Sequence, residues 1–436
     1  MICCPQTIIC PNWAILLFID NEISIFMPVK IEHMEIITRK YYAERVDSWI
    51  GKGNIIVLIG SRRVGKSYVL KDFIQRHSQN EDANFIFIDK EKRDYKHIVT
   101  RDDLDNYIET HFKKGKHNYI LIDEVQQITE FEKSVCSWYS EDNTDVIITG
   151  SNSKMLSGEL ATLLSGRYVE IRVHPLTYPE FLHFHNLNDS DESLMIYLNY
   201  GGLPGLRKIG LDSDEQVWAY LSSVFNTIML KDIIERHDIR NVPFLNKLIE
   251  FYADTTGKLT SANSIAKYMR SQNEKISSNL VLLYREFYKD AYLLEPVQRF
   301  DIHGKKLLES NEKVYWDDCG LRNLKSDGRM DSYIEKVIEN VVYKHLCYMG
   351  YKVQVGVLEA GEVDFVCTTP GQTVYVQVSY IIGEESTRER EFGPLERIKD
   401  NHPKYVISAT PLLASRNENG IKHLSLRAFL RSGFDE

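Results

Sequence analysis

The sequence predicts an α/β fold whose first part is a parallel sheet covered by helices. Four short apolar runs have the length and composition of strands that are buried on both faces. Segments with helical spacing separate these runs, and strands that alternate with helices are typical of a parallel sheet. The runs are residues 54–59, 85–88, 119–122 and 146–148.

Composition limits the classes of protein that need to be considered. A chain of 436 residues is too long for one core, so we expect two or three domains. The formal charge of −9 argues against capture of nucleic acid by the whole molecule, although a local basic patch could bind DNA. Seven dispersed cysteines without a CxxC pair predict reduced thiols in a cytoplasmic protein. We expect no membrane segment.

The pattern changes along the chain and predicts four segments. Residues 1–35 form an N-terminal extension, interpreted as disordered or as lying before the true start. Residues 36–240 hold the parallel sheet and then a helical lid. Residues 241–325 carry helical stretches over 244–252, 261–269 and 276–291 and then a hairpin, and a helix–turn–helix followed by a hairpin is the order of a winged helix. Residues 326–436 return to a mixture of helix and strand.

The first apolar run ends in a loop with the pattern GxxxxGK[ST]. The backbone amides of such a loop point at phosphate oxygens, and the helix that follows offers its positive N-terminus. Lys66 would neutralise the β- and γ-phosphates of ATP, and Ser67 would bind Mg²⁺. Arg62 and Arg63 would be solvated or steer phosphates. The residues expected to bind ATP are Gly60, Ser61, Arg62, Arg63, Val64, Gly65, Lys66 and Ser67.

Two acids end the third apolar run, as ATP hydrolysis requires. Asp123 would hold Mg²⁺ through water, and Glu124 would activate the attacking water. The next strand ends in the polar stretch 149–153, and a polar residue there would lie between the loop and the acid strand. Asn152 is the first choice for a sensor of the γ-phosphate, and Ser151 is the second. These residues favour hydrolysis over binding alone.

Together, the motifs resemble those of bacterial and archaeal AAA-type ATPases that end in a domain of unknown function with an endonuclease-like fold. The resemblance covers about residues 36–410. It implies an ASCE-type P-loop sheet, a winged helix and a degenerate PD-(D/E)XK nuclease fold, without a settled biological role. The matching segments are 60–67, 122–124, 149–152, 164–167, 175–181, 201–204, 313–321 and 362–365.

Two further features concern partners. Arg167 would serve as an arginine finger, either in cis or from a neighbouring subunit of an oligomer. Basic residues along 258–306 alternate with acids. Two interpretations of that segment stay open: contact with DNA, which the fold resemblance favours, and a packing module that relays the nucleotide state.

The closing segment departs from an active nuclease. Glu335 and Glu339 lie four apart on one face of a predicted helix and Asp364 lies on a strand, while the next strand carries Gln377 and Ser379. An active site of this type has a second carboxylate and a lysine at the last two positions. Gln377 and Ser379 leave the site short of one charge and without a polarising cation, so we expect no cleavage. Only a lysine such as Lys352, moving into the site, would change this expectation.

The sequence therefore predicts an ATPase that uses ATP and Mg²⁺. Its nucleotide state would reposition C-terminal modules that contact DNA or a protein partner. Two alternatives stay open. One is an ATP-controlled DNA endonuclease, and the other is a slow nucleotide-dependent signalling switch whose turnover is incidental.

Overall fold

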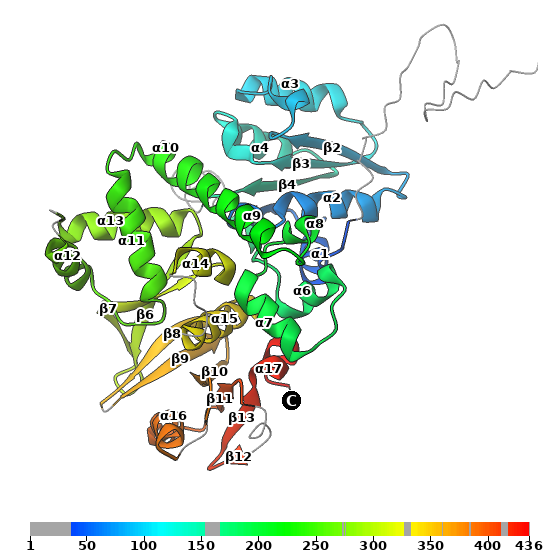
Figure 1. Ribbon diagram of the computed structural model, residues 1–436. Helices are drawn as coiled ribbons and strands as arrows, with labels where there is room; N and C mark the ends of the chain where they lie inside the picture. The colour runs from blue at the N-terminus through cyan, green and yellow to red at the C-terminus, as the bar shows by residue number, and fades with distance from the viewer. Residues whose placement is uncertain are drawn as a thin grey trace, which may run out of the picture. The chain divides into compact units, whose positions relative to one another are not determined.

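A computed structural model describes the chain from residue 36 onward with short gaps. The described residues are 36–152, 166–272, 274, 276–326, 333–359, 361–382, 385–410 and 417–435. The chain divides into a first unit, residues 1–37, and a second unit, residues 38–436, which holds all the elements below (Figure 1). The predicted extension, residues 1–35, lies outside the described residues.

The first sheet has five parallel strands in the order β2-β3-β4-β1-β5. Because β4 lies between the loop-bearing β1 and the acid-bearing β3, the sheet has the ASCE arrangement, which confirms the α/β fold class and the ASCE-type P-loop sheet that the sequence predicts. β5 was not predicted, since it is an edge strand whose residues are mostly half-exposed. The strands are β1 Ile55–Ile59, β2 Ala83–Asp89, β3 His117–Asp123, β4 Thr144–Gly150 and β5 Tyr168–Arg172.

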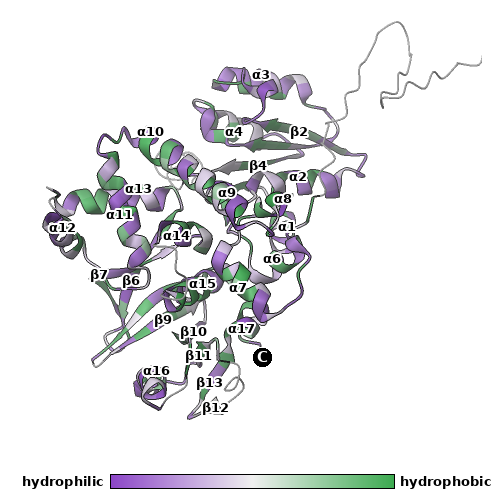
Figure 2. Ribbon diagram, in the orientation of Figure 1, coloured by the Kyte–Doolittle hydropathy of each residue, from purple (hydrophilic) through white to green (hydrophobic). Residues whose placement is uncertain are grey.

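Helices cover both faces of this sheet, as the apolar runs require. Ile56 and Leu58 of β1 belong to one buried cluster, whereas Ile55 and Val57 belong to another. Successive side chains of a strand point to opposite faces, so both faces are buried. Figure 2 shows apolar residues along these strands. The main helices of this part are α1 Lys40–Asp47, α2 Lys66–His77, α3 Arg101–His111 and α4 Phe131–Tyr139.

A helical segment follows β5, as predicted. Ser190 and Ser213 cap two of its helices by accepting hydrogen bonds from backbone amides. The segment also contains a π-helical stretch, η4 Ile228–Ile234. The other elements are α6 Tyr178–His185, α7 Asp191–Tyr200, α8 Leu206–Ile209, α9 Asp214–Thr227 and α10 Glu235–His237.

Three helices and a hairpin come next, in the predicted order. The hairpin does not stand free, because β6 pairs in parallel with β8 through Arg299 and Val355. It therefore ends an eight-stranded sheet with the order β12-β13-β11-β10-β9-β8-β6-β7. The elements are α11 Val242–Asp254, α12 Ala262–Ser271, α13 Ser278–Asp290, β6 Leu294–Asp301 and β7 Lys306–Trp316.

The rest of the chain completes this second sheet and covers it with helices. Val337 and Val342 of α15 pack in one cluster with Phe365 of β9. Within the part of the chain that the structure describes, no helix combines the length and the apolar character that crossing a bilayer requires. The elements are α14 Cys319–Lys325, α15 Ile334–Tyr348, β8 Lys352–Leu358, β9 Gly361–Thr369, β10 Gln372–Ser379, α16 Glu385–Arg397, β11 Lys404–Ser408, β12 Asn417–Glu418, β13 Ile421–Ser425 and α17 Leu426–Ser432.

Candidate nucleotide site

The glycine-rich loop joins β1 to α2 and adopts backbone angles that favour glycine. Gly60 and Gly65 have φ values of 143° and 100°. A Cβ atom on Gly60 would lie 2.3 Å from the carbonyl oxygen of Val173, so a larger residue does not fit there. Helix α2 begins at Lys66 directly after the turn. The loop therefore directs the N-terminus of α2 at the space that it encloses.

The Lys66 ammonium lies inside the loop. Its Nζ donates to the carbonyl oxygens of Gly60 and Ser61, both at 2.9 Å. The side chain is 4% exposed, and Glu124 Oε1 lies 4.0 Å from Nζ. Burial lowers the pKa of Lys66, although Glu124 and Asp123 act in the opposite direction. This cation is thus held where the phosphates of a nucleotide would need it.

Asp123 ends β3 beside two hydroxyl groups. Thr149 Oγ1 donates to Asp123 Oδ1 at 2.6 Å, and the Ser67 side chain forms a second hydrogen bond. Burial and then the Glu124 charge raise the pKa of Asp123 to about 6, despite both hydrogen bonds. A divalent cation beside Asp123 would offset this effect. A carboxylate next to a hydroxyl is an oxygen donor set that suits Mg²⁺, so these residues fit the predicted metal.

The Glu124 carboxylate is held by two side chains. Its Oε2 accepts from Ser151 Oγ at 3.1 Å and from Gln126 Nε2 at 2.5 Å. The backbone of Glu124 is left-handed, with φ of 54°, and its N–H donates to Thr149 Oγ1 at 2.9 Å. Because the chain turns here, the side chain of Gln126 folds back onto Glu124. The predicted base is therefore fixed next to Lys66.

The sensor role of Asn152 or Ser151 stays a prediction, and both residues are buried just beyond the end of β4. Ser151, the second choice, makes the hydrogen bond to Glu124, and Asn152 is buried immediately after it. Sequence reasoning missed Thr149 and Gln126 as parts of the site. The available signals were the last hydroxyl of β4 and a glutamine two positions after Glu124.

Arg62 is not solvated, contrary to one of the two expectations for it. Its Nε and Nη2 atoms donate to the two carboxylate oxygens of Asp232 at 2.5 and 3.0 Å. Glu91 lies 3.7 Å from Nη1. Asp232 comes from η4 and is 1% exposed. Arg63, by contrast, is exposed as expected.

Arg167 is not brought to this site. It directly precedes β5, and its carbonyl oxygen accepts from Ile55 N at 2.8 Å. Because β1 and β5 are parallel, Arg167 lies at the start of β1, whereas the loop follows its end. The two ends of β1 are roughly 13 Å apart. The structure therefore contradicts an arginine finger in cis, while a role from a second subunit stays a prediction.

Residues that are distant in the sequence form hydrogen bonds with the loop. Arg39, 6% exposed, donates to the carbonyl oxygens of Val64 at 3.0 Å and His174 at 2.8 Å, and it pairs with Glu180. Ser61 Oγ donates to Asp317 Oδ2 at 3.2 Å. The loop is thereby joined to the end of β7, which belongs to the second sheet.

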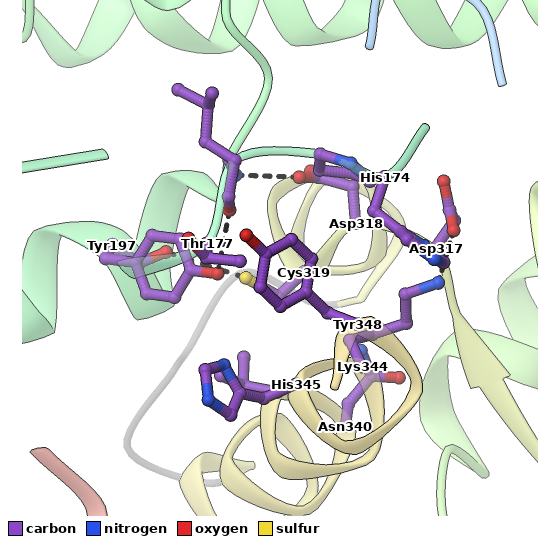
Figure 3. A pocket seen from close by; sticks show the side chains of 14 residues that line it. His174, Thr177, Tyr197, Asp317, Asp318, Cys319, Asn340, Lys344, His345 and Tyr348 are labelled. Carbon is purple, nitrogen blue, oxygen red and sulfur yellow. Dashed lines mark hydrogen bonds and ion pairs between the residues drawn. The ribbon is translucent and has the colours of Figure 1, made fainter. Parts of the chain in front are cut away.

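A small cavity lies beside this junction. It is lined by Asp317, Asn340 and Lys344, together with His174 and His345 (Figure 3). Its volume of about 30 Å³ suits a water molecule rather than a nucleotide. Burial lowers the pKa of both histidines, to about 4 for His345, so both are neutral at pH 7.

A lysine does lie among the acidic residues of the closing segment. It is Lys313, and not Lys352, the lysine considered from the sequence. Nζ of Lys313, on β7, lies 2.9 Å from Glu339, 2.8 Å from Glu362 and 3.0 Å from Asp364. Lys352 is exposed on β8. The expectation that no cation remains here is therefore wrong, since Lys313 comes from outside the predicted motif.

Gln377 is hydrogen-bonded rather than directed at a metal position. Its Oε1 accepts from Asp364 N at 3.2 Å, and its Nε2 donates to Glu391 Oε2 at 3.0 Å. Ser379 is buried at the end of β10. The cluster is thus a charge-paired centre in which the ammonium of Lys313 satisfies three carboxylates.

Comparison with known proteins identifies related chains. Residues 52–182 match an AAA domain, and residues 191–331 match a domain of unknown function (DUF8612). A protein of Haemophilus influenzae is 33% identical over 380 residues, covering 85% of this chain and 93% of that protein. A protein of Methanocaldococcus jannaschii is 29% identical over 405 residues, covering 88% and 87%.

Solved structures with partial likeness include a Walker-type ATPase of Pyrococcus abyssi. Its TM-score is 0.47 at 15% identity, covering 66% of this chain and 95% of that one. The Orc1 protein of Aeropyrum pernix in complex with DNA has a TM-score of 0.30 at 12% identity, covering 66% and 92%.

Proposed function

The chain belongs to the same family as its Haemophilus influenzae relative, a family with an AAA-type P-loop ATPase domain, and on this premise we propose that it hydrolyses ATP and uses its nucleotide state to move its C-terminal part. The observation that carries the proposal is the arrangement of Lys66, Asp123 and Glu124 around one loop. Lys66 and Glu124 lie 4.0 Å apart, and Asp123 is hydrogen-bonded to Ser67.

Each side chain then has a separate task. The loop amides and Lys66 bind the phosphates, and Lys66 neutralises charge that develops on the γ-phosphate. Ser67 and Asp123 would hold Mg²⁺, which supplies further positive charge at the phosphates when it is bound. Glu124 accepts a proton from the attacking water, and Ser151 with Gln126 keeps the carboxylate in place.

The contact of Ser61 with Asp317 supports a link between the nucleotide and the second sheet. Asp317 also pairs with Lys344 of α15 and with Arg172 of β5. The neighbouring Asp318 accepts from the backbone N of Gly202 at 2.8 Å. A change in the loop on binding ATP would therefore act directly on β7 and α15. The part that moves would be the two C-terminal segments, 241–325 and 326–436, which the pairing of β6 with β8 joins in one sheet.

For helix α13 of the segment 241–325, contact with a protein partner is favoured over contact with DNA. The two cations of α13 are paired within the chain, Arg285 with Glu312 and Lys289 with Glu286. Leu282 and Leu283, on the same helix, are 39% and 48% exposed. Phosphate contacts need available cations, whereas exposed apolar side chains suit protein contacts.

Cleavage of DNA is not part of the proposal. A metal ion at the acid cluster would have to displace Lys313, which is 4% exposed and paired with three carboxylates. A plasmid-nicking assay with Mg²⁺ or Mn²⁺ discriminates the nuclease alternative, because only that alternative predicts nicked product.

Steady-state ATP hydrolysis by the full chain tests the proposal. The wild type is measured with and without duplex DNA, beside Lys66→Ala and Glu124→Gln. We expect turnover by the wild type, loss of binding in Lys66→Ala, and binding without turnover in Glu124→Gln. A wild type that binds ATP but does not turn over would support the alternative of a nucleotide switch. Acceleration by DNA would contradict the preference for a protein partner.

A further inference from the structure

The ion pair between Arg62 and Asp232 joins the phosphate loop to the helical segment. Arg62 is the third residue of the loop, and Asp232 lies 170 positions away in η4. The contact is bidentate, with both carboxylate oxygens engaged. The carboxylate of Asp232 is almost fully buried, so the pair is screened little by water. The ion pair is therefore a buried contact with defined geometry, unlike an incidental pair on the surface.

Arg62 also interacts electrostatically with the groups assigned to the γ-phosphate. Burial by itself would lower the pKa of Arg62, but Asp232, Glu124 and Glu91 together raise it. Conversely, the charge of Arg62 is among the causes that lower the pKa of Lys66. Its guanidinium is therefore within electrostatic range of both the phosphate-binding lysine and the proposed base.

We propose that Arg62 exchanges Asp232 for the γ-phosphate of ATP, so that the pair is a latch which ATP opens and ADP leaves closed. The proposal rests on the ATP site described above and adds a γ-phosphate contact and a route to the helical segment. A guanidinium binds phosphate in the same two-pronged way as it binds a carboxylate. The exchange thus replaces one bidentate partner by another.

The structure provides a replacement partner for Asp232. Arg236, one turn further along the chain, has Nη2 3.5 Å from Asp232 Oδ1. The Nη1 atom of Arg236 is buried and has no hydrogen-bond partner among the described residues. When Arg62 moves to the phosphate, Arg236 still neutralises Asp232. The folded state therefore avoids the free-energy cost of an unpaired buried carboxylate.

The backbone around Asp232 has an uncommon conformation of a kind that is found at functional sites. Asp232 lies in a seven-residue π-helical segment between α9 and α10. π-Helical turns are rare and occur often at functional sites. Since α10 is followed closely by α11, a shift of this segment would reach the helices of residues 241–325.

The test compares affinities for Mg²⁺–ADP and for a non-hydrolysable Mg²⁺–ATP analogue by calorimetry. We expect Arg62→Gln to weaken binding of the analogue about ten- to a hundredfold, as for loss of a charge-assisted contact, with ADP binding unchanged. Asp232→Asn keeps the shape but weakens the latch, so it should strengthen binding of the analogue and again spare ADP. The opposite signs separate the latch from a structural role. Arg240→Gln, an exposed arginine in the same region, is the matched control.

Hydrogen exchange over residues 228–237 supplies a second readout. We expect the analogue, but not ADP, to change exchange there in the wild type, and Arg62→Gln to abolish the difference. Equal effects of either variant on both nucleotides, or no effect on either, would overturn the latch while leaving ATP binding intact. A wild type that binds neither nucleotide would instead refute the proposed function.

Discussion

Replacement of Lys313 by methionine tests whether the acid cluster is held together by its internal cation. The methionine keeps much of the volume but removes the charge shared by Glu339, Glu362 and Asp364. Removing one partner of a buried ion pair costs about 3–5 kcal/mol. The lower end applies here, because Glu362 is 30% exposed and can turn to water. We therefore expect a loss of about 3 kcal/mol at pH 8.

The loss should shrink as the pH falls. Burial raises the pKa of Glu339 to about 7 even with Lys313 present. A carboxyl whose pKa is raised by folding destabilises the folded state above that pKa, and the penalty disappears as the pH falls towards its unfolded value. Without Lys313, the pKa of Glu339 rises further. The variant should thus lie closer to the wild type at pH 5.5 than at pH 8.

Thermal unfolding of the full chain at both pH values measures these effects. Lys352→Met, which removes an exposed lysine on the adjacent part of the sheet, is the matched control and should change stability by less than about 0.5 kcal/mol. Millimolar Mn²⁺ or Ca²⁺ should raise the melting temperature of Lys313→Met more than that of the wild type. A Lys313 variant that unfolds like the control at pH 8 would refute the argument.

Two further predictions concern the nucleotide site. Gln126→Ala removes one of the two donors that hold Glu124, so turnover should fall about tenfold while the affinity for ATP stays near that of the wild type; a change in affinity alone would contradict this role. Because the pKa of Asp123 is about 6, a proton competes with Mg²⁺ below that pH. Mg²⁺ binding to the ATP-loaded chain should therefore weaken up to about tenfold per pH unit below 6. Asp123→Asn serves as the control, because its side chain does not titrate in this range. Any pH dependence that the variant retains therefore comes from protonation of ATP itself.

The first sheet could be predicted because its signals are local. An apolar run, a glycine-rich loop and a helix follow one another from residue 54 to 77, so no distant partner is needed to recognise them. The acids Asp123 and Glu124 were predicted for the same reason. β5 was missed because an edge strand with partly exposed residues lacks the continuous apolar run of a central strand.

The contacts that organise the site could not be predicted in the same way. Arg62 meets Asp232 across 170 positions, and Lys313 meets Asp364 across 51. A lone charge in a sequence gives no sign of its partner, and a solvated side chain was the reasonable expectation for each arginine of the loop. Arg167 was misplaced for a related reason: its position at the start of an unpredicted strand puts it at the wrong end of the sheet.

The hydrogen bond from Ser61 to Asp317 decides whether the second sheet senses the nucleotide directly. Ser61→Ala removes only the hydroxyl, while Asp317 keeps its pairs with Lys344 and Arg172. Phosphate binding uses backbone amides and Lys66, so affinity for ATP should change little. What should be lost is the coupling, for which about 1–3 kcal/mol is typical.

Hydrogen exchange in α15, measured with and without the ATP analogue, reads out this coupling. In the wild type, the analogue should change exchange around Lys344, since that residue pairs with Asp317. In Ser61→Ala, the same analogue should bind but leave α15 unaffected. If α15 responds equally in both chains, the signal does not pass through Ser61. The latch at Asp232 is then the next route to test, and at saturating analogue the double variant Ser61→Ala/Arg62→Gln should abolish the response that the single variant keeps.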